Sequence, residues 1–357
     1  MTEPFTQLLG SKIHAVFGQD AALQSLTPLA GDASSRRYYR ALLRGSGIPT
    51  SVIVMELPAG AGLPLSSEEL AIFKEGPREL PFLNVHRLLA GIGVNVPAIY
   101  GHWEPEHIIL LEDLGDTALW DQVQDRPDDE VLLWYQKALD QLLILHGRGS
   151  EARDPSCIAF QQRFDAKLYL WEFEHFIEWG LEKRPGAQIT AAAIASLRRT
   201  FADIAAVLER RSHCLSHRDY HSWNLMICGG AVRVIDFQDA LLAPPQYDLA
   251  SLLNDRITDS VVRPHLEESL VRYYIDGSRR QGYTIDVEEF FEIYRLSAIQ
   301  RDLKVVGRFY FLDLVKGKPG YRKFIPPTAR RLLRNLPQTP HTATILPLLE
   351  PHLEAMQ

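Results

Sequence analysis

The pattern of the chain changes near residue 113, and this change constrains the fold more than any other feature. Upstream, short alternating segments separated by turns predict an antiparallel meander over residues 25–57. A helix is predicted next, over residues 80–93, because its leucines share one face and it ends in glycine. Two further strands, joined by a short turn, are predicted at 98–103 and 107–112.

Downstream of this point the pattern is helical. Three long segments repeat apolar residues at helical spacing, and they lie at 129–147, 164–182 and 190–211. The sequence therefore predicts an α+β chain of two lobes. A small, β-rich N-lobe would comprise residues 1–112, and a larger, mainly helical C-lobe would comprise residues 113–357.

Composition narrows the possible partners. Apolar residues make up 46% and charged residues 23% of the 357 positions, as in ordinary globular proteins. The net charge of −7 provides no basic field for nucleic acid, so no nucleic-acid partner is expected. Cys157, Cys214 and Cys228 form no CxxC pair, which favours a reduced, intracellular protein.

No membrane partner is expected from the sequence either. The N-terminus lacks a basic segment followed by an apolar run, so it does not resemble a signal peptide. No apolar stretch approaches the length of about 18–20 residues that spans a bilayer. We therefore expect a cytoplasmic protein.

Residues 215–240 contain the strongest chemical signal. Asp219 is the last residue of a His-x-Asp motif that begins at His217, Asn224 comes five residues later, and Asp236 ends an apolar strand beyond the Gly229–Gly230 turn. Phosphoryl transfer from ATP needs a carboxylate that orients the attacking hydroxyl and accepts its proton, together with hard oxygen ligands for Mg²⁺. Single loop Asp and Asn residues usually make only turns and caps. The conjunction of spacing and strand context favours a kinase-type site.

The segments HRDYHSWNLM and VIDFQDA resemble the aminoglycoside phosphotransferase/choline kinase superfamily, which has a protein-kinase-like fold. Other segments resemble one branch of it, the bacterial anomeric N-acetylmuramate/N-acetylglucosamine kinases. These segments are DASSRRYYR, LLEDLGD, DFQDALLAPPQYDLASLL, AIQRDLKVVGRF and KGKPGYRKFIP. The resemblance runs from about residue 25 to about residue 335, and its catalytic motif is more specific than its flanking segments.

The resemblance implies roles for individual residues. Asp219 would be the catalytic base, and Asn224 and Asp236 would bind Mg²⁺. Three residues would support the catalytic loop: His217, Arg218 and Asp248. Backbone groups at the end of the last N-lobe strand would contact adenine, and they belong to Glu112, Asp113 and Leu114.

The sequence departs from protein kinases where the phosphates should bind. The strand over residues 51–57 has no Lys, and the loop before Arg36 has one Gly. The short side chains of Ser34 and Ser35 would let backbone amides approach a phosphate. We expect Arg36 or Arg37 to supply the missing positive charge, with Arg40 as a further candidate, or else all three arginines to be solvated. Neighbouring strand residues point to opposite faces, so at most one of Arg36 and Arg37 would face the nucleotide.

Four residues are candidates for substrate binding, each with a structural alternative. Trp223 could stack on a sugar or pack within the loop, and His221 could contact substrate or hydrogen-bond within the loop. Arg301 and Lys304 could face an acidic acceptor such as the lactyl carboxylate of N-acetylmuramate, or lie on a helix surface.

The sequence therefore predicts an ATP- and Mg²⁺-dependent sugar kinase that phosphorylates the anomeric hydroxyl of N-acetylmuramate or N-acetylglucosamine in peptidoglycan recycling. An aminoglycoside, choline or another small metabolite is the alternative acceptor, and an acidic chain suits a cationic one. A nucleotide-binding pseudokinase would explain the absent Lys, but not the intact catalytic and metal residues. A protein kinase is disfavoured, because no APE-like segment follows Asp236.

Overall fold

The computed structural model describes residues 3–29, 36–58 and 79–357 of the chain. The chain forms two compact units. The first comprises residues 1–78 and 96–116, and the second comprises residues 79–95 and 117–357. The division near residue 116 lies four residues beyond the expected domain boundary. The helix after residue 79 belongs to the second unit, whereas the sequence analysis placed it in the N-lobe.

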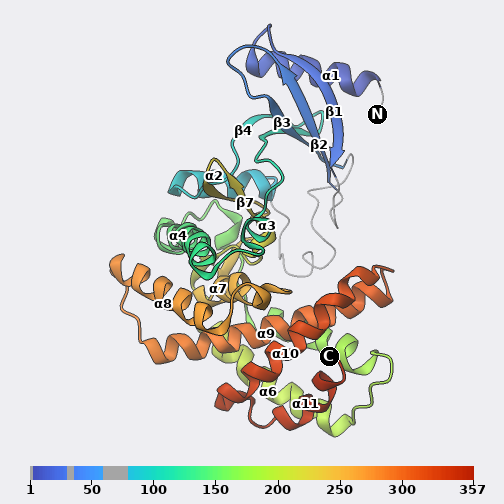
Figure 1. Ribbon diagram of the computed structural model, residues 1–357, viewed down its shortest axis with the longest axis vertical. Coiled ribbons are helices and arrows are strands. Elements are labelled where there is room, and N and C mark those ends of the chain that lie inside the picture. Colours follow the sequence, from blue (N-terminus) through green and yellow to red (C-terminus); the bar gives the residue numbers. More distant parts are fainter. Residues whose placement is uncertain (1–2, 30–35, 59–78) are drawn as a thin grey trace. The chain divides into compact units, whose positions relative to one another are not determined.

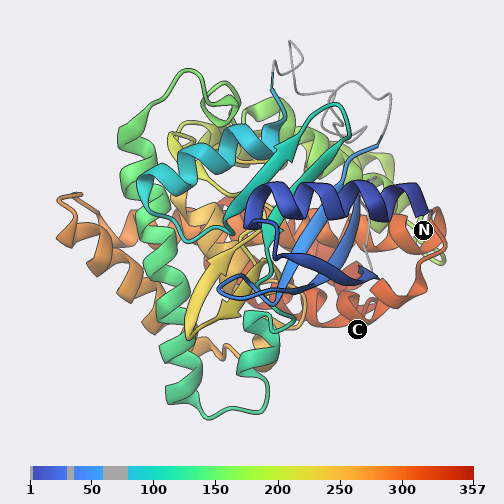
Figure 2. The same cartoon turned by 90° about the horizontal axis from the view of Figure 1, so that it is seen from above.

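The first unit is an antiparallel sheet with one helix. Its strands pair in the order β1-β2-β3-β5-β4, and the helix α1 runs across them (Figures 1 and 2). The elements are α1 (Glu3–Phe17), β1 (Ala22–Leu29), β2 (Arg37–Arg44), β3 (Ser51–Glu56), β4 (Ile99–Trp103) and β5 (Ile108–Glu112). All five predicted strands are confirmed.

One face of this sheet is covered by α1. Strand β2 alternates in the way that a half-buried strand requires: Tyr39, Ala41 and Leu43 are buried together with Leu9 and Ile13 of α1. The residues between them on β2 therefore lie on the opposite face. This alternation decides which arginines of the segment 36–40 share a face.

The second unit is mainly helical. Its helices are α2 (Pro81–Ile92), α3 (Leu119–Val123), α4 (Asp128–Ala152), α5 (Ala166–Phe176), α6 (Ala191–Glu209), α7 (Pro245–Leu253), α8 (Pro264–Arg280), α9 (Val287–Leu314), α10 (Ile325–Asn335) and α11 (Leu346–Glu354). A π-helical turn over Ile177–Glu182 continues α5, and short 3₁₀ turns include Ser222–Asn224 and Pro319–Phe324. The predicted helices at 129–147, 164–182 and 190–211 are confirmed, as is the α+β fold class.

Helix α9 lies at the centre of the second unit, where it packs against α5, α7 and α10 (Figure 1). Its backbone approaches α5 closely at Gly307. A Cβ atom at this position would lie 2.8 Å from the Cα of Phe176, so only glycine fits without a shift. This contact fixes how far α9 lies along α5, and therefore where the side chains of the preceding turns meet α5.

Two short antiparallel pairs complete the second unit. β6 (Cys214–Ser216) pairs with β9 (Leu241–Ala243), and β7 (Leu225–Cys228) pairs with β8 (Ala231–Val234). The chain between β6 and β9 contains the whole predicted catalytic motif. Within the described parts of the chain, no helix is both long and apolar enough to cross a membrane.

Candidate active site

The catalytic loop begins where β6 ends and folds back on itself. The backbone N–H of His221 donates to the carbonyl of Asp219 at 2.9 Å, and that of Asn224 donates to the carbonyl of His221 at 2.9 Å. The side-chain amide of Asn224 also donates to the carbonyl of Asp219, at 3.0 Å. These bonds shape residues 219–224 into a compact turn, with the side chain of Asp219 41% exposed.

A buried carboxylate fixes the start of this loop. Asp248, on α7, accepts hydrogen bonds from the backbone N–H groups of His217 and Arg218, at 2.7 and 2.9 Å. The imidazole of His146, on α4, lies 3.1 Å from the same carboxylate through Nε2. Burial favours the protonated carboxyl, but the hydrogen bonds and nearby imidazoles outweigh it and lower the pKa of Asp248. Asp248 would thus support the catalytic loop, as predicted, by accepting hydrogen bonds from its first backbone N–H groups.

The strand that carries Asp236 is joined to the same loop. The Nε2 atom of His217 lies 2.9 Å from the carbonyl oxygen of Ile235, and the N–H of Ile235 donates to the carbonyl of Asn224 at 3.0 Å. The side chains of Asn224 and Asp236 thus meet, with 3.4 Å between Nδ2 and Oδ2. The structure brings together the two predicted metal ligands although twelve residues separate them.

Two residues of this region have a left-handed backbone. Arg218 has φ 75° and Asp236 has φ 63°, a conformation that costs free energy for any residue with a Cβ atom. Both positions are flanked by the hydrogen bonds described above. The surrounding contacts therefore hold the catalytic loop and Asp236 in a conformation that an isolated chain would avoid.

The oxygen atoms at this point suit magnesium. The carboxylate of Asp236 and the amide oxygen of Asn224 are hard donors of the kind that Mg²⁺ prefers. Within residues 3–29, 36–58 and 79–357, no group of three or more His, Cys, Asp or Glu side chains could hold a metal ion. Mg²⁺ commonly keeps waters and phosphate oxygens as its remaining ligands, so two protein ligands fit this ion.

Positive charge surrounds the carboxylate of Asp219. Burial would raise its pKa, but the charges of Lys304, Arg301 and Arg218 outweigh burial and hold the pKa well below its usual range. The guanidinium of Arg301 lies 3.6 Å from Asp219 and 3.6 Å from Asp255. Asp219 is therefore a carboxylate at any physiological pH.

Arg301 and Lys304 lie in ion pairs within the second unit. The side chain of Arg301 is 4% exposed, and the ammonium of Lys304 is 2.8 Å from the buried carboxylate of Glu172 on α5. Gln300 donates to the other oxygen of Glu172 at 2.7 Å. Their charges act on Asp219, and a contact with substrate stays a prediction for each. The alternative, that these are charges on a helix surface, is wrong for the buried Arg301.

His221 and Trp223 pack inside the loop. His221 is buried, and burial lowers its pKa, so its imidazole is neutral at pH 7. The ring of Trp223 stacks on Trp120, with centroids 4.7 Å apart, and the guanidinium of Arg256 lies 4.5 Å from its centroid. Both residues have structural contacts, and a contact with substrate stays a prediction for each.

The predicted nucleotide residues belong to the first unit. The guanidinium of Arg40 forms an ion pair with Asp113 at 2.7 Å and a second with Asp116 at 2.8 Å. This pairing occupies Arg40 and ties the linker at residues 113–116 to β2. Burial would raise the pKa of Asp113, but Arg40 and its other hydrogen-bond donors lower it.

Arg37 is the first residue of β2, on the face that α1 covers, where its exposed side chain lies 3.3 Å from Glu56. Arg36 lies directly before the strand, and its position opposite Arg37 stays a prediction. Among the residues predicted to contact adenine, Glu112 donates its backbone N–H to the carbonyl oxygen of Ala98, at 2.8 Å. Ser34 and Ser35 lie outside the described residues.

Sequence reasoning missed three residues that shape the site. His146, Glu172 and Asp255 are buried at 5%, 0% and 4% exposure, and they contact Asp248, Lys304 and Arg301. A carboxylate in the middle of an apolar helical stripe, as at Glu172, was the available signal. Such a residue needs a partner, because a buried unpaired charge is costly.

The fold and this site define a phosphotransferase of the protein-kinase-like class. The model of the phosphotransferase enzyme family matches residues 25–283 of the chain. The chain therefore belongs to the phosphotransferase enzyme family, and it is an enzyme that uses ATP, as the sequence predicted.

Curated relatives match along most of the chain. An N-acetylmuramate/N-acetylglucosamine kinase of Pseudomonas aeruginosa is 29% identical over 328 residues, covering 91% of this chain and 87% of the relative. A protein of the same name from Caulobacter vibrioides is 30% identical over 321 residues, covering 84% of each chain. The resemblance to this branch of the family is confirmed.

Solved structures show the same fold at lower identity. The choline kinase LicA from Streptococcus pneumoniae has a TM-score of 0.56 and 16% identity, covering 94% of this chain and 100% of that chain. The ADP-bound aminoglycoside phosphotransferase APH(2'')-Ib has a TM-score of 0.59 and 13% identity, covering 97% of this chain and 99% of that chain. At such identities the likeness concerns the fold alone.

Proposed function

We propose that this enzyme transfers the γ-phosphate of ATP to the anomeric hydroxyl of N-acetylmuramate or N-acetylglucosamine, giving the sugar 1-phosphate. The observation that carries the proposal is the half-exposed carboxylate of Asp219, held ionised beside the paired side chains of Asn224 and Asp236. The names of the curated relatives support the choice of acceptor. A role in peptidoglycan recycling and a cytoplasmic location belong to the same proposal.

Asp219 would orient the acceptor hydroxyl and take its proton. A carboxylate whose pKa lies well below the usual range is a weak base, so it removes little charge from the hydroxyl before the phosphoryl group moves. The loose transition state of phosphoryl transfer tolerates this, because bond formation to the nucleophile is late. The main contribution of Asp219 is then positioning, with proton transfer following.

Asn224 and Asp236 would hold Mg²⁺ through their side-chain oxygens. When bound, the ion neutralises charge on the transferring phosphates. The left-handed backbone at Asp236 and the contact of His217 Nε2 with the carbonyl oxygen of Ile235 hold the end of the strand that carries Asp236. Asn224 turns its amide nitrogen toward Asp236, so its side-chain amide would rotate to present its oxygen to the ion.

Arg36 is our candidate for the charge that a strand lysine supplies in protein kinases. Arg36 directly follows Ser35 in the chain, so it adjoins the predicted phosphate loop. Glu112, Asp113 and Leu114 would contact adenine. Ser34 and Ser35 would complete the phosphate loop through their backbone amides.

The test of this proposal is an acceptor panel. ADP release with Mg-ATP would be measured for N-acetylmuramate, N-acetylglucosamine, glucosamine, choline and kanamycin, and products identified by ³¹P NMR. We expect turnover only with the two N-acetylated sugars and a signal from a sugar 1-phosphate. Asp236→Ala should abolish Mg-dependent nucleotide binding, whereas Asp239→Ala, at the neighbouring loop carboxylate, is the matched control.

Other results would redirect the proposal. Turnover with choline or kanamycin alone would contradict the acceptor, although the site residues would keep their roles. A product phosphorylated at another sugar hydroxyl would contradict the anomeric position. Absence of turnover with every acceptor, in a protein that still binds ATP, would favour a pseudokinase and overturn the proposal.

A further inference from the structure

Asp255 is a buried carboxylate just beyond the C-terminal end of α7. Its side chain is 4% exposed, and its Oδ1 atom lies 3.6 Å from Nη2 of Arg301, which is also 4% exposed. Arg301 reaches the catalytic loop with its other terminal nitrogen. Nη1 lies 3.6 Å from Oδ1 of Asp219 and donates to the carbonyl of Arg218 at 3.3 Å. One buried guanidinium therefore bridges the proposed catalytic carboxylate and a second, buried carboxylate.

The segment that carries Asp255 is fixed on both sides of this residue. The side-chain amide of Asn254 donates to the hydroxyl of Tyr294, on α9, at 2.6 Å. The buried guanidinium of Arg331, on α10, donates to the carbonyl of Arg256 at 2.6 Å. The position of Asp255 relative to α9 is therefore set by contacts other than its own ion pair.

The residue after Asp255 has a strained backbone. Arg256 has φ 45°, a left-handed conformation that costs free energy for a residue with a Cβ atom and that is common at functional sites. The guanidinium of Arg256 lies 4.5 Å from the ring centroid of Trp223, while Asp255 contacts Arg301. Two neighbouring residues of this turn thus connect to the two ends of the loop segment 219–223.

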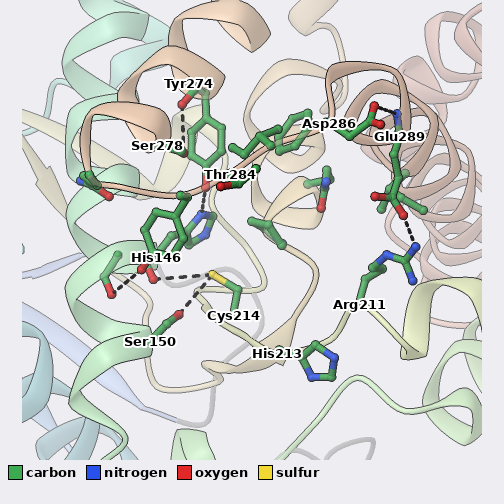
Figure 3. A pocket seen from close by; sticks show the side chains of 18 of the residues that line it. His146, Ser150, Arg211, His213, Cys214, Tyr274, Ser278, Thr284, Asp286 and Glu289 are labelled. Atoms are coloured by element: carbon green, nitrogen blue, oxygen red, sulfur yellow. Dashed lines mark hydrogen bonds and ion pairs between the residues drawn. The ribbon is translucent and has the colours of Figure 1, made fainter.

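This connection differs from the support that Asp248 gives. Asp248 accepts from backbone N–H groups at the start of the loop. Its imidazole partner His146 also contacts the hydroxyl of Tyr274 at 2.7 Å, beside a cavity in the helical unit (Figure 3). Asp248 therefore fixes the backbone, whereas Arg301 reaches the side-chain carboxylate of Asp219.

We propose that Asp255 is a positioning residue for phosphoryl transfer: it orients Arg301, which in turn holds Oδ1 of Asp219. The side chain of Asp219 is 41% exposed, so its other oxygen can receive the acceptor hydroxyl. A guanidinium suits this role, because its nitrogens form a rigid fork that contacts two carboxylates at once. The inference rests on the proposed role of Asp219 as base, but not on the identity of the acceptor.

The first test is Asp255→Asn, measured with whichever acceptor of the panel is turned over. The variant keeps the shape of the side chain and removes the charge that orients Arg301. We expect kcat to fall about tenfold, within the range in which contacting residues couple, while KM for MgATP stays within about twofold. Asp313→Asn is the matched control. Asp313 is also a buried carboxylate paired with an arginine, Arg322, but it lies near the C-terminal end of α9, and kcat should not change.

A double-mutant cycle separates positioning from general structural damage. If Asp255 acts through the carboxylate of Asp219, Asp255→Asn should change kcat by less than about twofold when Asp219 is already Asn. A structural defect would lower kcat by the same factor in both backgrounds. A fall that persists in full in the Asp219→Asn background would overturn the inference and leave the proposed function intact. Asp219→Asn with the kcat of the parent would contradict the proposed function, and the inference with it.

A second cycle tests the route through Arg301. Arg301→Gln leaves the buried charge of Asp255 without its partner on α9, so kcat should fall further than in Asp255→Asn, by about 30-fold. Adding Asp255→Asn removes that charge, so the double variant should be at least as active as Arg301→Gln alone. A double variant in which the two losses multiply would show that Asp255 does not act through Arg301, and would refute the inference.

Hydrogen–deuterium exchange gives a readout that needs no turnover. Asp255→Asn should raise exchange at least about threefold in peptides covering residues 218–224, because Arg301 then loses the partner that holds it against the carbonyl of Arg218. Asp313→Asn should leave these peptides unchanged, and thermal melts would show that each variant is folded. Unaltered exchange at 218–224 in folded Asp255→Asn would contradict the inference, whatever the acceptor panel shows.

Discussion

Asp248 offers the sharpest test of how the catalytic loop is held. Its carboxylate receives three donors, from His217 N, Arg218 N and His146 Nε2. Asp248→Asn keeps the shape of the side chain but replaces one acceptor oxygen with a donor. At least one of the three buried donors is then left without an acceptor, at a cost of about 1–3 kcal/mol, and the other bonds lose the strength that ionic charge provides.

The total effect on the loop should be about 2–4 kcal/mol. Since 1.4 kcal/mol corresponds to a tenfold change in rate, an effect of this size on the position of the loop would lower kcat by about 30- to 700-fold. KM for the nucleotide should change less than kcat, because the predicted adenine contacts lie in the other unit and only the Mg²⁺ ligands adjoin the loop. Steady-state kinetics and exchange of the 214–221 peptides would measure both effects.

A matched variant separates positioning from general destabilisation. Asp165 caps α5 by accepting from the N–H of Leu168 at 2.9 Å, so Asp165→Ala should lower stability by about 1 kcal/mol and leave kcat unchanged. If Asp248→Asn kept kcat within twofold of the parent and exchange at the loop were unaltered, the inference that Asp248 positions Asp219 would be refuted.

The same carboxylate should give the protein a pH-dependent stability. The pKa of Asp248 is lower in the folded chain than in the unfolded one, so its contribution is present above the unfolded value of about 3.9 and is lost as the pH falls through the folded value. Unfolding followed below about pH 4 should show a smaller loss of stability in Asp248→Asn than in the parent.

The remaining predictions concern the groups around Asp219 and the packing of α9. Asp219→Asn should lower kcat by about 10²- to 10⁴-fold while calorimetry shows unchanged ADP binding; equal losses of both would contradict its role as base. Lys304→Met removes the strongest charge that lowers the pKa of Asp219, so the acid limb of the kcat–pH profile should move to higher pH, and an unmoved limb would exclude this coupling. Gly307→Ala should cost about 1–3 kcal/mol of unfolding free energy in thermal melts, because its Cβ would lie 2.8 Å from the Cα of Phe176, and a variant as stable as the parent would contradict the close approach.

Much of the fold could be predicted because the periodicities are strong. The alternation of residues 37–43 follows from one covered face of the sheet, and the long stripes after residue 129 follow from helices that each bury one side. The assignment of α2 was less predictable. Its own sequence identifies a helix but does not tell which unit it packs with, since that depends on contacts distant in the chain.

The catalytic motif could be predicted because its parts are close in sequence and their order is chemically specific. The electrostatic setting of Asp219 could not, because it depends on pairs separated by more than a hundred residues, such as Glu172 with Lys304. Helical spacing shows that Arg301 and Lys304 are neighbours, but not that α9 is central and its polar side chains buried. For Arg40, the two carboxylates that occupy it lie more than seventy residues away.

The left-handed backbone at Arg218 and Asp236 has a consequence for how the enzyme fails. A backbone conformation that costs free energy persists only while the contacts around it hold it in place. Local opening of the segments that contain Arg218 and Asp236 should therefore cost less free energy than opening of the surrounding helices. Warming should therefore inactivate the enzyme at a temperature where its helices are still folded. Heat inactivation of this protein would begin as a reversible event confined to a few residues, well before the chain unfolds.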